Sequence, residues 1–506
     1  MEPNVNPKDS GTTRSGVFQT ATEMLGQMRS GQISAVELLD LHLDQVCAVN
    51  SEINAIVAFD EDRARHQARL ADEARCRGED TGSLHGLPMT IKDVFSVVGM
   101  PVTGGLPHLS GYMPESDSEV VTALREAGAV IFGKSNVPEG AGDHQSYNAI
   151  YGSTNNPWDL ARTPGGSSGG AAAALAAGMT PLEIGSDVGG SIRCPAHFCG
   201  VYGHKSSYGV VPVQGHVPPG PNSLRKAEML VAGPMARDPH DLELLFNVIS
   251  RPKDSSRDAN HWPLPETRHQ RLEDFRVAVW LDEKSYPVDT RYGDTIEGLV
   301  EDLKRLGANV RAARPDIDPS ASQSTYFKTL FGEFCASAPQ KIYDASIAAR
   351  EAVGGDHGPY GEWIAAATTQ ALRTWQGHLE HREQMRRKWA AYFREFDVLI
   401  CPVMSTVAFP HDHHGADHVE QLARTIEISG EKRPYLDNLL WPGVVTVANL
   451  PSTVVPTRRF VDGLPAGAQI VGDFLEDRTT LRFAQLLHDR LGGYEMPPRW
   501  RRDQSH

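Results

Sequence analysis

The stretch that decides the fold runs from Arg162 to Gly200 and reads RTPGGSSGGAAAALAAGMTPLEIGSDVGGSIRCPAHFCG. Two clusters of glycine and serine enclose an alanine-rich run. The residues of that run, Ala171 to Ala177, are strong helix formers with very small side chains, so we expect a buried helix that packs closely on its neighbours. Gly178 is expected to end this helix, because glycine readily adopts the backbone conformation of a helix C-terminus.

The two glycine–serine clusters leave runs of peptide N–H groups uncovered by side chains and place a hydroxyl beside them. Such a backbone can hold a phosphate, or it can hold the oxyanion that forms when the hydroxyl attacks a carbonyl group. A phosphate-binding P-loop has a lysine directly after its glycines, and neither cluster does. The glycines of one cluster alone would be explained equally well by tight turns. Two clusters that each present a serine favour a site for nucleophilic attack.

A candidate base for such an attack lies upstream of the clusters. A serine hydroxyl is a weak nucleophile and needs a neighbouring base to accept its proton. Lys92 ends an apolar, strand-like run, residues 86–93, that reads GLPMTIKD. The change from apolar to charged residues there is typical of a strand whose end reaches a cleft.

Three segments together resemble the amidase signature family: GLPMTIKD at 86–93, PGGSSGG at 164–170 and GSDVGGSIRCP at 185–195. In that family a lysine, a serine in a cis peptide and a nucleophilic serine form the catalytic triad. The resemblance assigns these roles to Lys92, Ser167 and Ser191, with the cis bond between Gly166 and Ser167. It extends over nearly the whole chain from about Ala21 onward.

The resemblance also implies a reaction. Neutral Lys92 would take a proton from Ser167, Ser167 would take one from Ser191, and the Ser191 hydroxyl would attack an amide carbonyl. Ser167 would then protonate the leaving nitrogen, and water would release the acyl group from Ser191. The oxyanion is expected to be bound by the backbone N–H groups of Val188, Gly189, Gly190 and Ser191.

The predicted substrate-binding residues lie mainly in the loop 136–145, which resembles the family segment that lines the acyl side of the active site. Glycine and alanine leave room there for a substrate. The predicted set comprises Gly140, Ala141, Gly142, His144 and Ser168. For Ser168 two roles stay open, because serine also caps helices: a hydrogen bond within the catalytic network, or a cap on the following helix.

The small residues at 140–142, together with aromatic residues, indicate the shape of the substrate. Tyr147, Phe327 and Trp441 are expected near the site, which suggests an aryl or otherwise bulky apolar acyl group. Asp187 and Arg193 are interpreted as a buried or half-buried pair that orients the nucleophile loop and has a structural role.

The fold class expected from these elements and from the resemblance is α/β, with a single large domain built on a mixed central β-sheet covered by helices, the amidase signature fold. Residues 275–280, 296–306 and 308–310 form a strand–helix–strand unit by their apolar periodicity. We expect a loose arm over 1–16, the amidase signature domain over 17–495 and an exposed tail over 496–506. Residues 252–265 are polar and proline-bearing and are the best candidate for a linker.

The charge balance and the apolar content of the sequence limit the kinds of partner that the protein can bind. The chain has 49 basic and 64 acidic residues and a formal net charge of −15, which argues against nucleic acid or an anionic membrane as a partner. No signal peptide and no apolar run of the ~18 residues that a membrane span needs is evident, so we expect a cytoplasmic protein. The six scattered cysteines are expected to be reduced thiols. The N-terminal helices could cover the core or a second copy, so a homodimer stays open.

Histidines gather in one loop, at His411, His413, His414 and His418. They lie in a polar stretch bounded by glycine and proline, without the spacing of a helical metal motif. We therefore expect a solvated loop near the substrate entrance, with no metal and no cofactor.

The function expected is hydrolysis of a small-molecule carboxylic amide through an acyl-enzyme on Ser191. Carbamates and anilides present the same carbonyl geometry and stay open as substrates. An alternative of another class is the amidase-like subunit of a tRNA-dependent amidotransferase, which needs partner chains. A member that binds amides without turnover is disfavoured, because Lys92, Ser167 and Ser191 are all present.

Overall fold

The computed structural model describes residues 16–79, 82–220, 223–250, 264–337, 340, 343–344, 347, 358–415 and 423–501. Most of the predicted N-terminal arm, most of the predicted linker, His418 and the last five residues lie outside these ranges.

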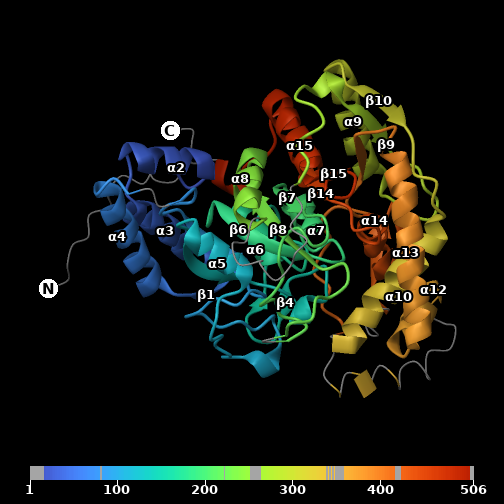
Figure 1. Ribbon diagram of the computed structural model, residues 1–506, viewed down its shortest axis with the longest axis horizontal. Coiled ribbons are helices and arrows are strands. Elements are labelled where there is room, and N and C mark those ends of the chain that lie inside the picture. The colour runs from blue at the N-terminus through green and yellow to red at the C-terminus, as the bar shows by residue number, and fades with distance from the viewer. Residues whose placement is uncertain are drawn as a thin grey trace.

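Three helices precede the catalytic part of the chain and form one side of the molecule (Figure 1, dark blue). They are α2 (Ala21–Ser30), α3 (Ala35–Ile53) and α4 (Glu61–Cys76). The side chain of Ser34 accepts from the N–H of Glu37 and the Glu37 carboxylate accepts from the N–H of Ser34, so the capping box that begins α3 is present. The buried faces of these helices join the main hydrophobic core.

The centre of the fold is a mixed sheet of eight strands in the order β10-β9-β11-β15-β14-β7-β8-β6. Their bounds are β6 Leu182–Asp187, β7 Tyr202–Lys205, β8 Val231–Ala236, β9 Arg276–Val279, β10 Asn309–Ala312, β11 Val398–Pro402, β14 Ser452–Val461 and β15 Leu464–Val471. The β10–β9 and β9–β11 pairs are parallel and the others are antiparallel. The predicted unit at 275–310 is confirmed, since α9 (Thr290–Arg305) connects the parallel strands β9 and β10.

A smaller sheet carries the predicted base. It has the order β1-β3-β2, with β1 Ile56–Phe59, β2 Pro88–Lys92 and β3 Val130–Ser135. Strand β2 runs parallel to β3, and every residue of β2 is buried. The hydroxyl of Thr90 donates to Glu183 of β6 over 2.6 Å, so this contact ties β2 to the edge of the large sheet.

The alanine-rich segment forms α6 (Gly169–Ala176), and all eight of its residues are buried. Gly178 follows with φ +71°, as the sequence predicts for the end of this helix. A Cβ on Gly170 would lie 2.3 Å from the backbone nitrogen of Asn136, so only glycine allows this close approach of α6 to the chain after β3. The helix α7 (Arg193–Cys199) begins two residues after Ser191.

Two groups of helices complete the fold (Figure 1). The buried sides of α5 (Glu119–Glu126), α8 (Pro239–Ile249), α9 and α15 (Asp477–Leu491) belong to the main core. The helices α10 (Pro319–Ser337), α12 (Gly358–Thr368), α13 (Leu372–Tyr392) and α14 (Leu440–Thr446) build a second apolar cluster around Trp389 and Trp441. In Figure 1 these helices lie on the side opposite α2–α4.

The remaining elements are short. They are the 3-10 turns Pro107–Leu109, Glu139–Ala141, Leu272–Asp274 and Tyr435–Leu439, the strands β4 Tyr147–Asn148, β5 Gly152–Ser153, β12 Thr425–Ile428 and β13 Glu431–Pro434, and the helix α16 Pro498–Arg501. The single α/β domain with a mixed central sheet is therefore confirmed. The exact domain boundaries stay predictions, and part of the predicted tail forms α16. No helix within the described ranges is long and apolar enough to cross a membrane.

The close approach at Gly170 makes a stability prediction. Gly170→Ala is expected to lower the free energy of unfolding by about 1–3 kcal/mol, because the new methyl group must displace backbone at Asn136. The matched control is Gly26→Ala in the exposed face of α2, where no atom lies within 4 Å of the new Cβ. That variant is expected to gain about 0.5–1 kcal/mol. Urea unfolding measures both, and equal midpoints for the two variants would contradict the packing argument.

Candidate active site

The predicted triad begins where β2 ends. Lys92 is fully buried, and its Nζ lies 2.7 Å from the Oγ of Ser167 and 3.0 Å from the Oγ of Ser186. The Gly166–Ser167 peptide bond is cis, as the resemblance implies. The predicted base and the predicted relay hydroxyl are therefore in direct hydrogen-bond contact.

Glycine is required on the N-terminal side of Ser167. Gly165 has φ +88°, and a Cβ on Gly166 would lie 2.3 Å from the carbonyl oxygen of Asp143. The Ser167 segment therefore packs backbone against backbone on the loop that contains the predicted substrate residues.

Ser191 lies at the surface of a cavity, with 7% of the residue exposed. Its carbonyl oxygen accepts a hydrogen bond of 3.0 Å from the N–H of Ser168, which couples the two serine clusters. Gly190 has φ +99°, and a Cβ there would lie 2.9 Å from Pro442. The turn that carries Ser191 is therefore held by the hydrogen bond from Ser168 and by the packing of Gly190 against Pro442.

A buried ion pair organises this turn. Arg193 Nη2 lies 2.9 Å from Asp187 Oδ1, and both side chains are fully buried. The same carboxylate accepts from the N–H groups of Gly190 and Ile192, at 2.9 and 3.0 Å. Burial raises the pKa of Asp187, but the charge and hydrogen bonds of Arg193 outweigh it and hold this pKa below its usual range. The pairing expected for Asp187 and Arg193 is observed.

The hydrogen bond to Asp187 also limits the predicted oxyanion donors. The N–H of Gly190 is occupied by the carboxylate. The N–H groups of Val188, Gly189 and Ser191 donate to no acceptor among the described residues. These three groups are the ones available to a developing oxyanion in this structure.

The environment of Lys92 favours its neutral form. Burial lowers its pKa from the ordinary value to about 7, while the charges of Asp187 and Glu183 oppose this shift. Asp93 follows Lys92 in the chain, but its carboxylate lies 3.2 Å from the Nζ of Lys134 and also accepts from Thr103. Lys92 is therefore surrounded by hydroxyl and carbonyl groups, and no carboxylate among the described residues lies within ion-pair distance of it.

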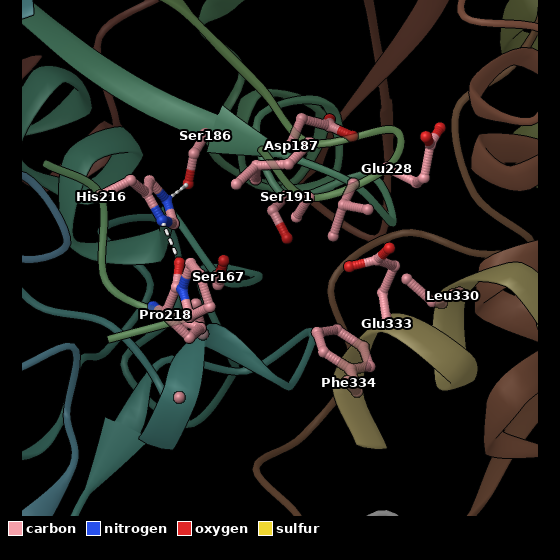
Figure 2. Close-up of a pocket in the computed structure, with 16 residues that line it drawn as sticks. Ser167, Ser186, Asp187, Ser191, His216, Pro218, Glu228, Leu330, Glu333 and Phe334 are labelled. Carbon is pink, nitrogen blue, oxygen red and sulfur yellow. Dashed lines mark hydrogen bonds between the residues drawn. The ribbon is translucent and has the colours of Figure 1, made fainter. Parts of the chain in front are cut away.

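The cavity at Ser191 has two branches that share Ala141, Val188, Ser191, Leu330 and Phe334. One branch, called the serine branch here, is further lined by Gly140, Ser167, Ser186, His216, Glu228 and Glu333 (Figure 2). The aromatic branch is further lined by Gly142, His144, Phe331, Tyr435, Leu436 and Leu439. Ser191 therefore borders both branches.

The chain is similar in sequence to known proteins over most of its length. The Amidase family model matches residues 37–481 of the chain. This chain belongs to the amidase signature family. One subunit of the glutamyl-tRNA(Gln) amidotransferase of Anaeromyxobacter sp. (strain K) is 33% identical over 503 residues, which cover 92% of this chain and 95% of that protein.

Two further similarities concern hydrolases. Indoleacetamide hydrolase of Bradyrhizobium diazoefficiens is 30% identical over 482 residues, with 94% of this chain and 86% of that protein covered. The solved structure of 6-aminohexanoate cyclic dimer hydrolase with its substrate has 26% sequence identity and a TM-score of 0.75, and the match covers 95% of this chain and 99% of that one.

Four of the five predicted substrate-binding residues lie at the cavity. Gly140, Ala141, Gly142 and His144 line the branched cavity. His144 has a second contact, since its Nε2 lies 2.7 Å from the carbonyl oxygen of Gly189. Ser168 is fully buried, and its side chain does not cap α6; its Oγ lies 3.4 Å from the carbonyl oxygen of Ser186. This contact is with the backbone of Ser186, and Ser168 is not among the residues that line either branch of the cavity, so its role in the network stays a prediction.

The three aromatic residues expected near the site pack elsewhere. Tyr147 stacks on His413 with ring centroids 4.0 Å apart. Phe327 stacks on Tyr360, and Trp441 meets the edge of Trp280. The aromatic side chains at the cavity are instead Phe331, Phe334 and Tyr435.

The sequence analysis missed two groups at this site. Ser186 and His216 line the serine branch, and both belong to one hydrogen-bonded chain that reaches Lys92. Asp143 and Arg424 form a buried ion pair of 2.6 Å that holds the loop carrying Gly142 and His144. Ser186 lies inside the GSDVGG motif and was identifiable as polar, whereas the partners His216 and Arg424 have no local signal in the sequence.

The histidine-rich loop packs on the cavity loop. Gln145 Nε2 donates to the carbonyl oxygen of Asp412 over 2.6 Å, and the N–H of Asp412 donates back to Gln145 Oε1 over 2.9 Å. His414 Nδ1 lies 2.8 Å from Asp412. Across the described residues, no group of three or more His, Cys, Asp or Glu side chains is arranged to hold a metal ion.

The Asp187–Arg193 pair makes a second stability prediction. Asp187→Asn is expected to cost about 3–5 kcal/mol, because it leaves the Arg193 guanidinium buried without its counter-charge. The control is Asp462→Asn, which breaks an exposed contact with Arg291 and should cost at most about 1 kcal/mol. Chemical denaturation of both variants measures the difference, and similar losses would show that the buried pair has no special structural role.

Proposed function

We propose that this protein hydrolyses linear carboxylic amides through an acyl-enzyme on Ser191, giving a carboxylate and ammonia or an amine. The observation that carries the proposal is the 2.7 Å contact between a buried lysine and Ser167 at a cavity that Ser191 also lines. Membership in the amidase signature family supports amide hydrolysis as the class of reaction.

The first step forms the bond between Ser191 Oγ and the carbonyl carbon. The hydroxyl proton of Ser191 passes to Ser167, whose own proton passes to the lone pair of Lys92. The π electrons of the carbonyl move onto its oxygen, which is bound by the N–H groups of Val188, Gly189 and Ser191. The step creates no net charge, because the positive charge of the lysinium balances the negative charge of the oxyanion.

The second step breaks the C–N bond. The lysinium returns its proton to Ser167, and Ser167 protonates the leaving nitrogen as the oxyanion electrons re-form the carbonyl. The amine departs and Ser191 keeps the acyl group as an ester. Water then attacks this ester with the same relay as base, which restores Ser191 and releases the carboxylate.

The lining of the cavity supports a bulky substrate. The aromatic branch is built from Phe331, Tyr435 and leucine side chains, which suit an aryl or other apolar group. The serine branch contains Glu228 and Glu333, whose carboxylates form ion pairs with Arg382 and Arg225 at 2.7 and 2.5 Å, so their charges are compensated (Figure 2). Carbamates and anilides fit the same arrangement and are alternative substrates of the same chemistry.

A second candidate is an amidase-like subunit of a tRNA-dependent amidotransferase, favoured by the 33% identity to a subunit of such an enzyme. Such a subunit would release ammonia from glutamine for a partner chain. Glutamine also carries an α-ammonium and an α-carboxylate, which the apolar side chains of Phe331, Leu436 and Leu439 in the aromatic branch would accommodate poorly.

One panel of assays tests both candidates. The purified protein is offered glutamine, aryl and alkyl primary amides, p-nitroanilides and aryl carbamates under identical conditions. We expect kcat/KM for an aryl amide or anilide to exceed that for glutamine by more than about 10²-fold, since a buried polar group without a partner is costly. A preference for glutamine, with co-purification of partner chains, would support the amidotransferase role instead.

The nucleophile is tested by Ser191→Ala. The residue borders glycine backbone and loses only a hydroxyl, so the fold should persist while turnover falls to background. A fluorophosphonate or sulfonyl fluoride probe should label wild-type Ser191 and leave the variant unlabelled, as read by peptide mass mapping. Retained turnover, or labelling of another residue, would refute the assignment.

The base is tested by the pH dependence of kcat/KM. Lys92 accepts a proton only when it is neutral, and burial brings its pKa to about 7, so kcat/KM should rise through that pH and level off above it. Lys92→Ala should remove the rise together with about 10²–10⁴-fold of the rate. Lys92→Arg should not restore activity, because guanidinium stays protonated. An arginine variant with a normal rate and profile would show that another group is the base.

A further inference from the structure

A chain of hydrogen bonds leads from the cavity wall to Lys92. His216 Nδ1 lies 2.8 Å from the carbonyl oxygen of Pro218, and His216 Nε2 lies 2.9 Å from the Oγ of Ser186. Figure 2 shows both contacts beside Ser167 and Ser191. The Oγ of Ser186 lies in turn 3.0 Å from the Nζ of Lys92.

The backbone holds His216 in a fixed position relative to Lys92. The N–H of Ser96 donates to the carbonyl oxygen of Gly215 over 2.9 Å, and the N–H of Val217 donates to that of Val94 over 2.7 Å. The chain segment that follows Lys92 therefore pairs with the residues on both sides of His216. The edge of the Phe95 ring also contacts the imidazole, with centroids 5.3 Å apart.

Chemistry fixes the direction of every hydrogen bond in this chain. A backbone carbonyl can only accept, so the Nδ1 of His216 carries the ring proton. Burial, followed by the nearby charge of Lys92, lowers the pKa of His216 to about 3, so the ring is neutral and its Nε2 has a lone pair. The hydroxyl of Ser186 must donate to that lone pair, and its oxygen then accepts from an N–H of Lys92.

Neutral Lys92 has two N–H bonds and one lone pair. One N–H points to the Oγ of Ser186, and the second has the carbonyl oxygen of Ser186 at 3.4 Å. The lone pair is left for the fourth direction, where the Oγ of Ser167 lies at 2.7 Å. When Lys92 takes the proton, all three N–H bonds of the ammonium have an acceptor.

We propose that His216 is a positioning residue that acts through Ser186 to turn the lone pair of neutral Lys92 towards Ser167. The inference rests on the proposed function, since it assumes that Lys92 is the base. Without an acceptor at Nε2, the Ser186 hydroxyl is free to rotate and donate to the lone pair of Lys92. The lone pair of Lys92 then accepts a hydrogen bond from Ser186 and no longer points at Ser167, so the proton transfer from Ser167 slows.

A double-mutant cycle tests this linkage. His216→Phe keeps the ring but removes both nitrogen atoms, and Ser186→Ala removes the hydroxyl through which His216 acts. Each single variant is expected to lower kcat/KM on its pH plateau by about 10-fold, the equivalent of one hydrogen bond. The double variant should be no slower than Ser186→Ala within about 2-fold, because His216 has no route to Lys92 without the hydroxyl.

The pH profile supplies a readout that a packing defect would not move. Ser186 accepts from Lys92 and so favours the ammonium, against the same background of Asp187 and Glu183 charges. In both single variants the rising limb of kcat/KM should therefore shift to lower pH while the plateau falls. The matched control is His42→Phe, which replaces a buried histidine bonded to the carbonyl of Gly178 and should leave the profile unmoved.

Two conservative variants keep the test independent of the folding of His216→Phe. In His216→Gln the amide oxygen can reach the position of Nε2 and accept from Ser186, so most of the activity should remain. In His216→Asn the amide ends near the position of Nδ1, so the acceptor for Ser186 is lost and the rate should fall about 10-fold.

The outcomes separate this inference from the function on which it rests. If Lys92→Ala is inactive but His216→Asn equals wild type, or the losses of His216→Phe and Ser186→Ala multiply, the positioning role is wrong and the base is unaffected. If Lys92→Ala stays active, the proposed base itself is wrong. A non-additive cycle with a shifted rising limb supports the inference.

Discussion

The active site depends on the burial of one amine without a carboxylate beside it. The structure contains a direct comparison, because Lys92 and Lys134 are both fully buried on adjacent strands. Lys134 lies 3.2 Å from Asp93, whereas Lys92 has hydroxyl oxygens of Ser167 and Ser186 as its nearest partners. Desolvation disfavours the charge of both amines, but only Lys134 has an ion-pair partner that offsets it. The same residue type therefore forms a buried ion pair at one position and is a candidate base at the other.

Close approach of backbone to backbone brings the parts of the site together. The two serine clusters meet where a side chain would collide, since a Cβ on Gly165 would lie 2.9 Å from Pro195 and one on Gly185 would lie 2.9 Å from the Oγ of Ser168. The alanine side chains of α6 allow the same close packing behind the site. The small residues let the segments that carry Lys92, Ser167 and Ser191 pack close together.

Much of this arrangement could be predicted from the sequence, and the reason is that it is local or carried by a motif. The buried α6, the strand ending at Lys92 and the pairing of Asp187 with Arg193 follow from short segments. The aromatic lining could not be predicted. Phe327 and Phe331 are one helical turn apart on α10, and only the tertiary packing decides which turn reaches the cavity. The position of His216 depends likewise on pairing between segments about 120 residues apart.

The ion pair beside Ser191 links the proposed oxyanion site to the proposed base, Lys92. Asp187 raises the pKa of Lys92 through its charge, and an unpaired carboxylate at that position would raise this pKa further and favour the ammonium form. Arg193 contacts the carboxylate with two of its nitrogen atoms, which offsets this field while keeping the geometry that fixes Gly190 and Ile192. A neutral side chain in place of Asp187 would leave Arg193 uncompensated, so neither charge is dispensable. The pair therefore orders the turn of Ser191 without placing an uncompensated negative charge near Lys92.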